Sequence, residues 1–280
     1  MTGVYLLGET ATVTCNMNGK YRGPVYFYRN GELLTSRHLY PKEHILRFRV
    51  TSRNQGGWYQ CQFGALIRTR NLLSQISETL TLIVPEPLQQ PEVSLDQMSG
   101  VYLEGESATT TCTVNQDYHE IYFYRDYKQL TSRQFSITKN IATFAVYSQN
   151  NAGQYTCRYG IIIGKRQLLS QTSENVTLTV VETLVQPVLS FDQRSGVYVD
   201  GETVTVTCNL HRVEAGFISF YQNYVELTAD ELLQKWNVGT FPVTGTRQAG
   251  MYQCSYGISV ETRQFQSQPS EAVRLSVAGQ

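Results

Sequence analysis

The chain has 280 residues, and its 23 basic and 23 acidic residues give a formal net charge of zero. That balance excludes the strongly basic surface of a nucleic-acid-binding protein, so we expect no nucleic-acid partner. The chain contains 19 tyrosines and few long helix-forming stretches, and this composition favours an all-β fold.

No stretch of the sequence approaches the ~20 apolar residues that a membrane-spanning helix needs. Gly8, Glu9 and Thr10 interrupt the start of the chain before the apolar core of a signal peptide could develop. We therefore expect a mature ectodomain or part of one, which would be attached to a membrane only through a segment outside this sequence.

The first recurring element is a seven-residue segment that ends in a Gly-Glu turn. It occurs at residues 3–9, 100–106 and 196–202. After each turn, apolar residues alternate with polar ones up to a cysteine. A period of two is typical of a strand with one buried face, so we expect such a strand in each repeat.

An aromatic strand follows in each repeat, at residues 25–28, 121–124 and 218–221. Alternation places Phe27, Phe123 and Phe220 in the core and turns the neighbouring tyrosines outward.

The last recurring element is a tyrosine two residues before the second cysteine of each repeat. This spacing is typical of a tyrosine corner, in which the hydroxyl bonds nearby backbone. The tyrosines concerned are Tyr59, Tyr155 and Tyr252.

Six cysteines allow 15 pairings, but the repeat selects one of them. The predicted disulfides are Cys15–Cys61, Cys112–Cys157 and Cys208–Cys254, with separations of 46, 45 and 46 residues. Short C-x-x-C spacings of the kind found in metal sites are absent. Disulfides persist in oxidising compartments, so the chain should be secreted or face the cell exterior.

Each repeat therefore predicts a sandwich of two antiparallel sheets. Proline-marked boundaries divide the chain into domains at residues 1–86, 87–183 and 184–280, and the short linkers favour contact between neighbours. Residues 91–97 and 187–193 precede the shared segment in the second and third domains, and the first domain has no such residues. We expect the first domain to lack strand A and the natural protein to have residues upstream.

The sequence resembles the leukocyte immunoglobulin-like receptor, Fc-receptor-like and alpha-1B-glycoprotein branch of the immunoglobulin superfamily. The similar segments are AGMYQCSYG at 249–257, SQPSE at 267–271 and YFYRNGEL at 26–33. The resemblance implies three tandem immunoglobulin-like domains. It also implies either a cell-surface immune receptor or a secreted plasma protein that captures a toxin, a protease or a cysteine-rich secretory protein.

The sequence contains no motif typical of a catalytic, metal or cofactor site. The four histidines have no metal-ligand spacing, no nucleophile or phosphate-binding motif occurs, and every cysteine has a structural role. We expect neither an enzyme nor a cofactor. The single N-x-S/T sequence, at Asn175, is the candidate glycosylation site.

Charge is unevenly distributed along the chain. The first domain has 10 basic and 5 acidic residues, whereas the other two have 7 and 9, and 6 and 9. An ordinary solvated face or a docking surface for an acidic or sulfated ligand would each explain the basic residues. The candidate ligand-binding residues are Arg22, Arg47, Arg49, Arg53, Arg68, Arg70, Tyr26 and Tyr28.

An arginine also recurs before the last strand of each domain, as Arg70, Arg166 and Arg263. Recurrence favours a structural role, and we expect these arginines to brace the loop between the last two strands.

The leading functional hypothesis is an immune-type receptor ectodomain that binds an antibody Fc, an MHC-like molecule or another extracellular protein. The secreted capturing protein is the alternative. A third hypothesis is homophilic adhesion, with the basic first domain of one molecule against the acidic third domain of another. Only this third hypothesis predicts a homo-oligomer.

Overall fold

The computed structural model describes residues 2–16, 24–34, 44–67, 70–131, 136–211 and 216–278. These residues form two compact units. Unit 1 contains residues 1–92, 113–122 and 157–173, and unit 2 contains residues 93–112, 123–156 and 174–280. The first repeat therefore lies in unit 1 and the third in unit 2, while the second repeat contributes to both.

The first repeat has one sheet in the order β1-β8-β6-β3-β4, with β7 paired to β6, and a second sheet formed by β2 and β5. Its elements are β1 (Thr2–Val4), β2 (Thr10–Thr14), β3 (Val25–Arg29), β4 (Glu32–Leu33), β5 (Ile45–Arg49), η1 (Arg53–Gln55), β6 (Gly57–Ile67), β7 (Arg70–Leu73) and β8 (Leu80–Ile83).

The second repeat has the sheet order β10-β18-β16-β12-β13, with β17 paired to β16, and a second sheet in the order β14-β15-β11-β9. Its elements are β9 (Glu92–Leu95), β10 (Val101–Leu103), β11 (Ser107–Thr113), β12 (Glu120–Arg125), β13 (Lys128–Gln129), β14 (Ser136–Thr138), β15 (Ile141–Ala145), η2 (Gln149–Asn151), β16 (Gly153–Ile163), β17 (Arg166–Leu169) and β18 (Val176–Val181).

The third repeat has the sheet order β20-β28-β26-β22-β23, with β27 paired to β26, and a second sheet in the order β19-β21-β25-β24. Its elements are β19 (Val188–Phe191), β20 (Val197–Val199), β21 (Thr203–Asn209), β22 (Phe217–Gln222), β23 (Val225–Glu226), β24 (Leu233–Lys235), β25 (Val238–Pro242), η3 (Thr246–Gln248), β26 (Gly250–Val260), β27 (Arg263–Gln266) and β28 (Val273–Ala278).

This architecture confirms the predicted fold class of three tandem two-sheet sandwiches. Strands β1, β10 and β20 overlap the start of the recurring seven-residue segment, and each pairs in parallel with the last strand of its own repeat. β9 and β19 are strand A of the second and third repeats, and the sequence of the first repeat has no counterpart. The domain boundaries remain a prediction.

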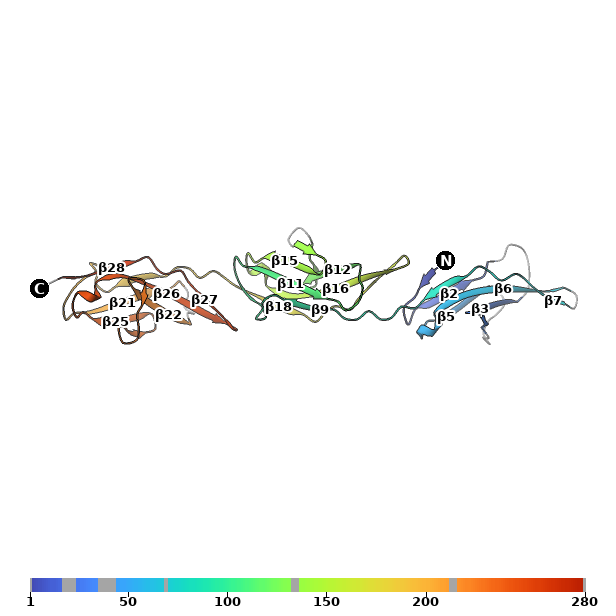
Figure 1. Cartoon of the computed structure of the whole chain (residues 1–280), viewed down its shortest axis with the longest axis horizontal. Coiled ribbons are helices and arrows are strands. Elements are labelled where there is room, and N and C mark those ends of the chain that lie inside the picture. The colour runs from blue at the N-terminus through green and yellow to red at the C-terminus, as the bar shows by residue number, and fades with distance from the viewer. Residues whose placement is uncertain are drawn as a thin grey trace. The chain divides into compact units, whose positions relative to one another are not determined.

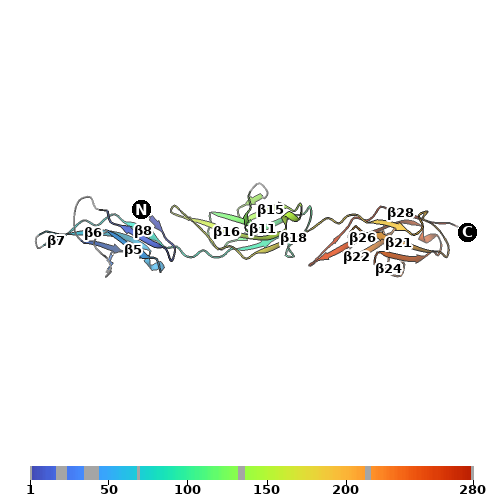
Figure 2. The same ribbon diagram turned by 180° about the vertical axis from the view of Figure 1, so that it is seen from behind.

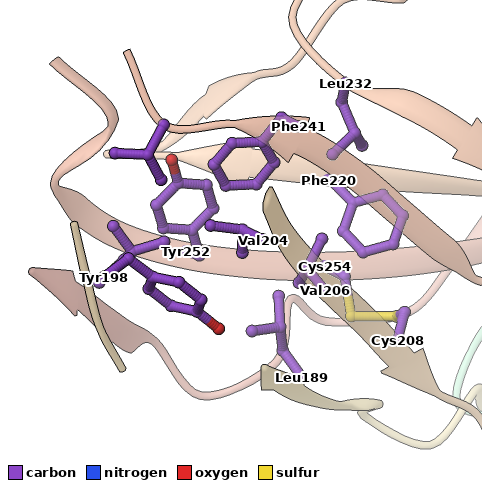
Figure 3. Packing of buried hydrophobic residues seen from close by; sticks show 12 residues of the cluster. Leu189, Tyr198, Val204, Val206, Cys208, Phe220, Leu232, Phe241, Tyr252 and Cys254 are labelled. Carbon is purple, nitrogen blue, oxygen red and sulfur yellow. A yellow bond between two sulfur atoms is a disulfide. The ribbon is translucent and has the colours of Figure 1, made fainter. Parts of the chain in front are cut away.

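Each core is built from the residues that alternation selects. In β2 the exposed and buried positions alternate strictly, and Ala11, Val13 and Cys15 join the buried cluster of the first repeat. Phe27 and Phe220 are 3% and 1% exposed. In the third repeat, Figure 3 shows the side chains of both sheets meeting around the Cys208–Cys254 disulfide.

The predicted disulfides Cys15–Cys61 and Cys208–Cys254 are formed, and Cys112 and Cys157 are also disulfide-bonded. The three tyrosine corners are formed as well. The hydroxyls of Tyr59, Tyr155 and Tyr252 donate to the carbonyl oxygens four residues earlier, at 2.6, 2.7 and 2.8 Å.

The tyrosine-corner rings also stack on a phenylalanine from the facing sheet, which the sequence analysis did not foresee. The centroid distances are 5.8, 5.4 and 5.5 Å for Phe48–Tyr59, Phe144–Tyr155 and Phe241–Tyr252. Offset stacking of this kind adds about 0.5–1.5 kcal/mol beyond the area buried. The ring pair joins the two sheets in each repeat.

A glycine at the start of β16 is required by a side chain that lies over it. Gly153 has φ 143°, and a Cβ there would collide with the Asp126 carboxylate, whose Oδ1 accepts from the Gln154 N–H at 2.9 Å. Gly105, in the same repeat, has φ 96° with nothing near its missing Cβ.

We expect Gly153→Ala to lower the free energy of unfolding by about 3 kcal/mol, because it adds a collision to the backbone strain. Gly105→Ala carries the strain alone and should cost about 1 kcal/mol. Urea denaturation of the two variants measures the difference. Equal losses would contradict the role assigned to Asp126.

Candidate functional site

Two of the exposed basic residues described in the first repeat lie on β5. Arg47 and Arg49 are both exposed, opposite Thr12 and Thr10 of β2. Arg49 Nε donates to the Gly8 carbonyl at 3.2 Å, and no described residue bonds the Arg47 guanidinium. The face therefore offers two cations side by side on one sheet.

The other predicted arginines do not join this face. Arg53 forms an ion pair with Glu86, and both side chains are exposed. Arg70 is the first residue of β7. In Figures 1 and 2 the β7 hairpin lies at one end of the first repeat, away from β5. Arg22 and Arg68 lie outside the described residues.

The predicted outward-facing tyrosines are half-buried rather than exposed. The Tyr28 hydroxyl donates to Gln62 Oε1 at 2.9 Å, and the Tyr26 ring packs over Gly64, where a Cβ would meet it at 3.1 Å. Neighbouring residues of the same sheet therefore cover part of the tyrosine surface that we expected to be open to a ligand.

Two strongly exposed tyrosines in hairpin turns were missed by the sequence analysis. Tyr127 and Tyr224 are 94% and 78% exposed, and both have a positive φ, of 66° and 68°. They occupy the hairpin turn where the first repeat has Gly31, which also has a positive φ, of 85°. Tyrosine in place of that glycine is the sequence signal that could have found them, because bulky residues rarely adopt this conformation.

Asn175 is exposed and immediately precedes β18. Thr177 of the sequon is exposed too, so the sequon is sterically open, and its glycosylation remains a prediction. Within the ranges that the structure describes, no three metal-binding side chains cluster together, and no helix is long and apolar enough to cross a membrane.

The recurring arginine that begins β17 forms a bidentate ion pair in unit 1. Arg166 donates to both oxygens of Glu9 at 2.8 and 2.7 Å and to the Val4 carbonyl at 2.9 Å. Its hydrogen bond, helped by the Leu6 N–H, lowers the pKa of Glu9 from 4.5 to about 2. Because the folded-state pKa is the lower one, this stabilisation is complete above about pH 4.5 and is lost as the pH falls through 2.

The same arrangement recurs in unit 2. Arg263, the first residue of β27, donates to both oxygens of Glu106 at 2.8 and 2.7 Å and to the Val101 carbonyl at 2.6 Å. The hydrogen bond from Arg263 lowers the pKa of Glu106. The guanidinium carbon also lies 4.7 Å from the centroid of the Phe265 ring.

The expectation that these arginines brace their own hairpin loop is therefore wrong for Arg166 and Arg263. Each bonds a carboxylate that lies 157 residues earlier in the sequence, in the preceding repeat. Both members of the pair recur along the chain, and this shared recurrence is the signal that could have connected them.

Known proteins similar to this chain include a receptor and an adhesion molecule, while no family model matches the sequence. Fc receptor-like protein 5 of Homo sapiens is 23% identical over 276 residues, which are 96% of this chain and 26% of the relative. Platelet endothelial cell adhesion molecule of Sus scrofa is 23% identical over 137 residues, which are 46% of this chain and 18% of the relative. The chain thus spans about a quarter or less of the length of these relatives.

Similar solved structures include a marsupial T cell receptor, with a TM-score of 0.48, 13% identity and coverage of 94% of this chain and 96% of that one. The three-domain ectodomain of mouse nectin-like molecule 4 has a TM-score of 0.43 and 17% identity, and the coverage is 99% of this chain and 96% of that one.

Proposed function

Because this chain is an extracellular member of the immunoglobulin superfamily, we propose that it is part of an immune-type receptor ectodomain and binds a protein ligand. The observation that carries this proposal is the extent of the similarity to Fc receptor-like protein 5, which runs through 96% of the chain and so through all three repeats. The work of the molecule is then recognition, and no residue is assigned to catalysis.

The β5 face of the first repeat is the surface that best suits such a ligand. Arg47 and Arg49 are exposed neighbours on one strand, in a repeat with 10 basic and 5 acidic residues. Long-range attraction to an acidic protein would speed encounter, and this effect weakens as salt screens the charges. We therefore assign this face the role of steering an acidic ligand.

Charge reversal tests the assignment. The purified chain is passed over immobilised antibody Fc fragments and MHC-like ectodomains, and the association rate is measured at ~50 mM and ~150 mM salt. For a fragment that binds, Arg47→Glu with Arg49→Glu should slow association about tenfold at low salt and flatten the salt dependence.

A matched control reverses two exposed arginines of the third repeat, Arg194 and Arg247, which changes the net charge equally. This control should leave most of the association rate intact. If both variants lost the association rate equally, the effect would come from net charge alone. If the rate of the Arg47→Glu, Arg49→Glu variant were unchanged, the β5 face would not be part of the binding site.

A further inference from the structure

A cavity of about 440 Å³ lies beside the tyrosine corner of the third repeat. It is bounded by the corner itself, the end of β22, the end of β25 and the turn that follows β23. Its lining combines apolar residues with two acidic ones, and these are Leu227, Phe241, Pro242, Asp230 and Glu231. A cavity of this size accepts a small molecule or one long side chain.

The other two repeats place an arginine of their own at this corner. Arg29 and Arg125 are the last residues of β3 and β12, and each interacts with the hydroxyl of the corner tyrosine in its repeat. The Arg125 guanidinium also donates to the Asn150 carbonyl. The last residue of β22, at the equivalent position of the third repeat, is Gln222. A guanidinium thus fits against the corner tyrosine, and β22 supplies none.

Gln222 replaces the hydrogen bond of the arginine but not its charge. Its Nε2 donates to the Arg247 carbonyl at 2.8 Å, as the arginine of the second repeat donates to the equivalent carbonyl. Burial raises the pKa of Tyr252, and the negative charge of Glu231 raises it further. In the other repeats burial also raises the pKa of the corner tyrosine, but the arginine opposes the rise. The third repeat therefore has negative charge where the others have a cation.

The turn after β23 carries a second change of charge. The first two repeats read LTSR at residues 34–37 and 130–133, whereas the third reads LTAD at residues 227–230. Glu231 comes next, at a position where neither of the other repeats is acidic. This change and the one at β22 act in the same direction, because both remove an arginine and the turn adds two carboxylates.

Both carboxylates have oxygen atoms available to a cation. No described residue bonds the Asp230 carboxylate, and Glu231 uses only Oε2, which accepts from the Thr228 N–H and Oγ1 at 3.0 and 3.1 Å. Arg247 is the only basic residue among the described residues of the lining, and it donates to Thr244 Oγ1 at 3.1 Å. The lining therefore keeps an excess of negative charge.

A neighbouring repeat does not cover this corner. The second repeat is followed by the third, and the two meet in unit 2 through the Arg263–Glu106 ion pair. Even so, Tyr147 of the second repeat is 76% exposed. Tyr147 is the equivalent of Thr244, which lines the cavity, because each directly follows the valine that pairs with the recurring glutamate. The opening of the cavity is therefore a property of the third repeat itself.

We propose that this cavity binds a guanidinium group from outside the chain, with Asp230 and Glu231 as anionic partners and the Tyr252 hydroxyl oxygen as a further acceptor. A guanidinium fits better than an ammonium, because the other repeats hold one at this corner and its planar fork suits carboxylates. The apolar residues of the lining would cover the methylene stem. The source is either an arginine side chain of a protein or a free guanidinium compound. This site is separate from the β5 face and from the receptor function proposed above.

Isothermal titration calorimetry of the purified chain with N-acetyl-arginine amide at low salt tests the proposal. We expect a Kd of about 1 mM, which is typical of one weak specific contact. N-acetyl-citrulline amide has the same shape without the charge and should bind about tenfold more weakly or worse. Free arginine separates the two sources. Tighter binding than that of the amide assigns the site to a free compound, and equal or weaker binding assigns it to a side chain of a protein.

Three variants give the matched comparison. Gln222→Arg returns the arginine of the other repeats to this corner, so it should fill the cavity and weaken binding about tenfold or more without lowering the thermal midpoint. Asp230→Asn with Glu231→Gln keeps the shape of the lining and should also weaken binding about tenfold or more. Glu261→Gln with Glu271→Gln removes the same charge from exposed positions outside the lining and should leave the Kd within about twofold.

Three results would overturn the proposal. The first is a wild-type chain that binds no N-acetyl-arginine amide up to ~10 mM, and the second is equal binding of the citrulline compound or equal binding by the Gln222→Arg variant. The third is binding that appears only after Arg247→Asn, which introduces the residue that the other repeats have as Asn54 and Asn150. Arg247 would then fill the cavity in the wild-type chain. None of these measurements uses a protein ligand, so their outcome is independent of the proposed receptor function.

Discussion

Replacing both Cys208 and Cys254 by alanine should lower the free energy of unfolding of the third repeat by about 4 kcal/mol. The disulfide closes a loop of 46 residues, and for that length the chain-entropy model gives about this value. Both cysteines are fully buried among the side chains shown in Figure 3, so the substitution also removes packed sulfur atoms from the core.

Tryptophan fluorescence makes this measurement specific to the third repeat. The chain has two tryptophans, Trp58 and Trp236, and Trp58 is 52% exposed. In a Trp58→Phe background, urea denaturation followed by Trp236 emission reports the third repeat alone. Reductant should shift the transition of the parent chain in the same direction and leave that of the double variant unchanged. A loss below about 1 kcal/mol would contradict a structural role for this disulfide.

The parts of the fold that the sequence predicted are those encoded by short-range pattern. Alternation placed Ala11 and Val13 in the core, and the two-residue offset from a cysteine placed the hydroxyl of Tyr252 on nearby backbone. Such features depend on the direction of a side chain from its own strand. Three occurrences at one spacing then distinguished them from coincidence.

The ion pairs could not be predicted in the same way. Arg166 recurs with its equivalents, but its partner Glu9 is 157 residues away and belongs to another repeat. Local spacing does not encode which end of one sandwich meets the next. Tyr28 is half-buried rather than exposed for a different reason, because Gln62 on the neighbouring strand of the same sheet bonds its hydroxyl.

Equivalent positions of the repeats also differ in how deeply their side chains are buried. Leu72 and Phe265 occupy the same position in their hairpins, yet they are 51% and 5% exposed. Phe265 belongs to a buried cluster with Val101 and Leu184, which come from the second repeat and the linker that follows it. An equivalent position in the repeat predicts the strand and the direction of the side chain. How much that side chain contributes to the free energy of unfolding depends on the neighbour that covers it.

Phe265→Ala should therefore lower the free energy of unfolding of the third repeat by about 3 kcal/mol, which is typical when a buried phenylalanine is truncated. The cavity would open between residues of the second and third repeats, because the cluster also contains Val101 and Val181. Leu72→Ala removes a side chain that already faces water, so it should change the stability of the first repeat by less than about 0.5 kcal/mol.

The same tryptophans measure both effects, with Trp236 reporting Phe265→Ala and Trp58 reporting Leu72→Ala, each in a background where the other tryptophan is phenylalanine. A loss below about 1 kcal/mol for Phe265→Ala would show that the cluster does not hold the second and third repeats together. The expected contrast would show that this position stabilises the chain only where a neighbouring repeat covers it.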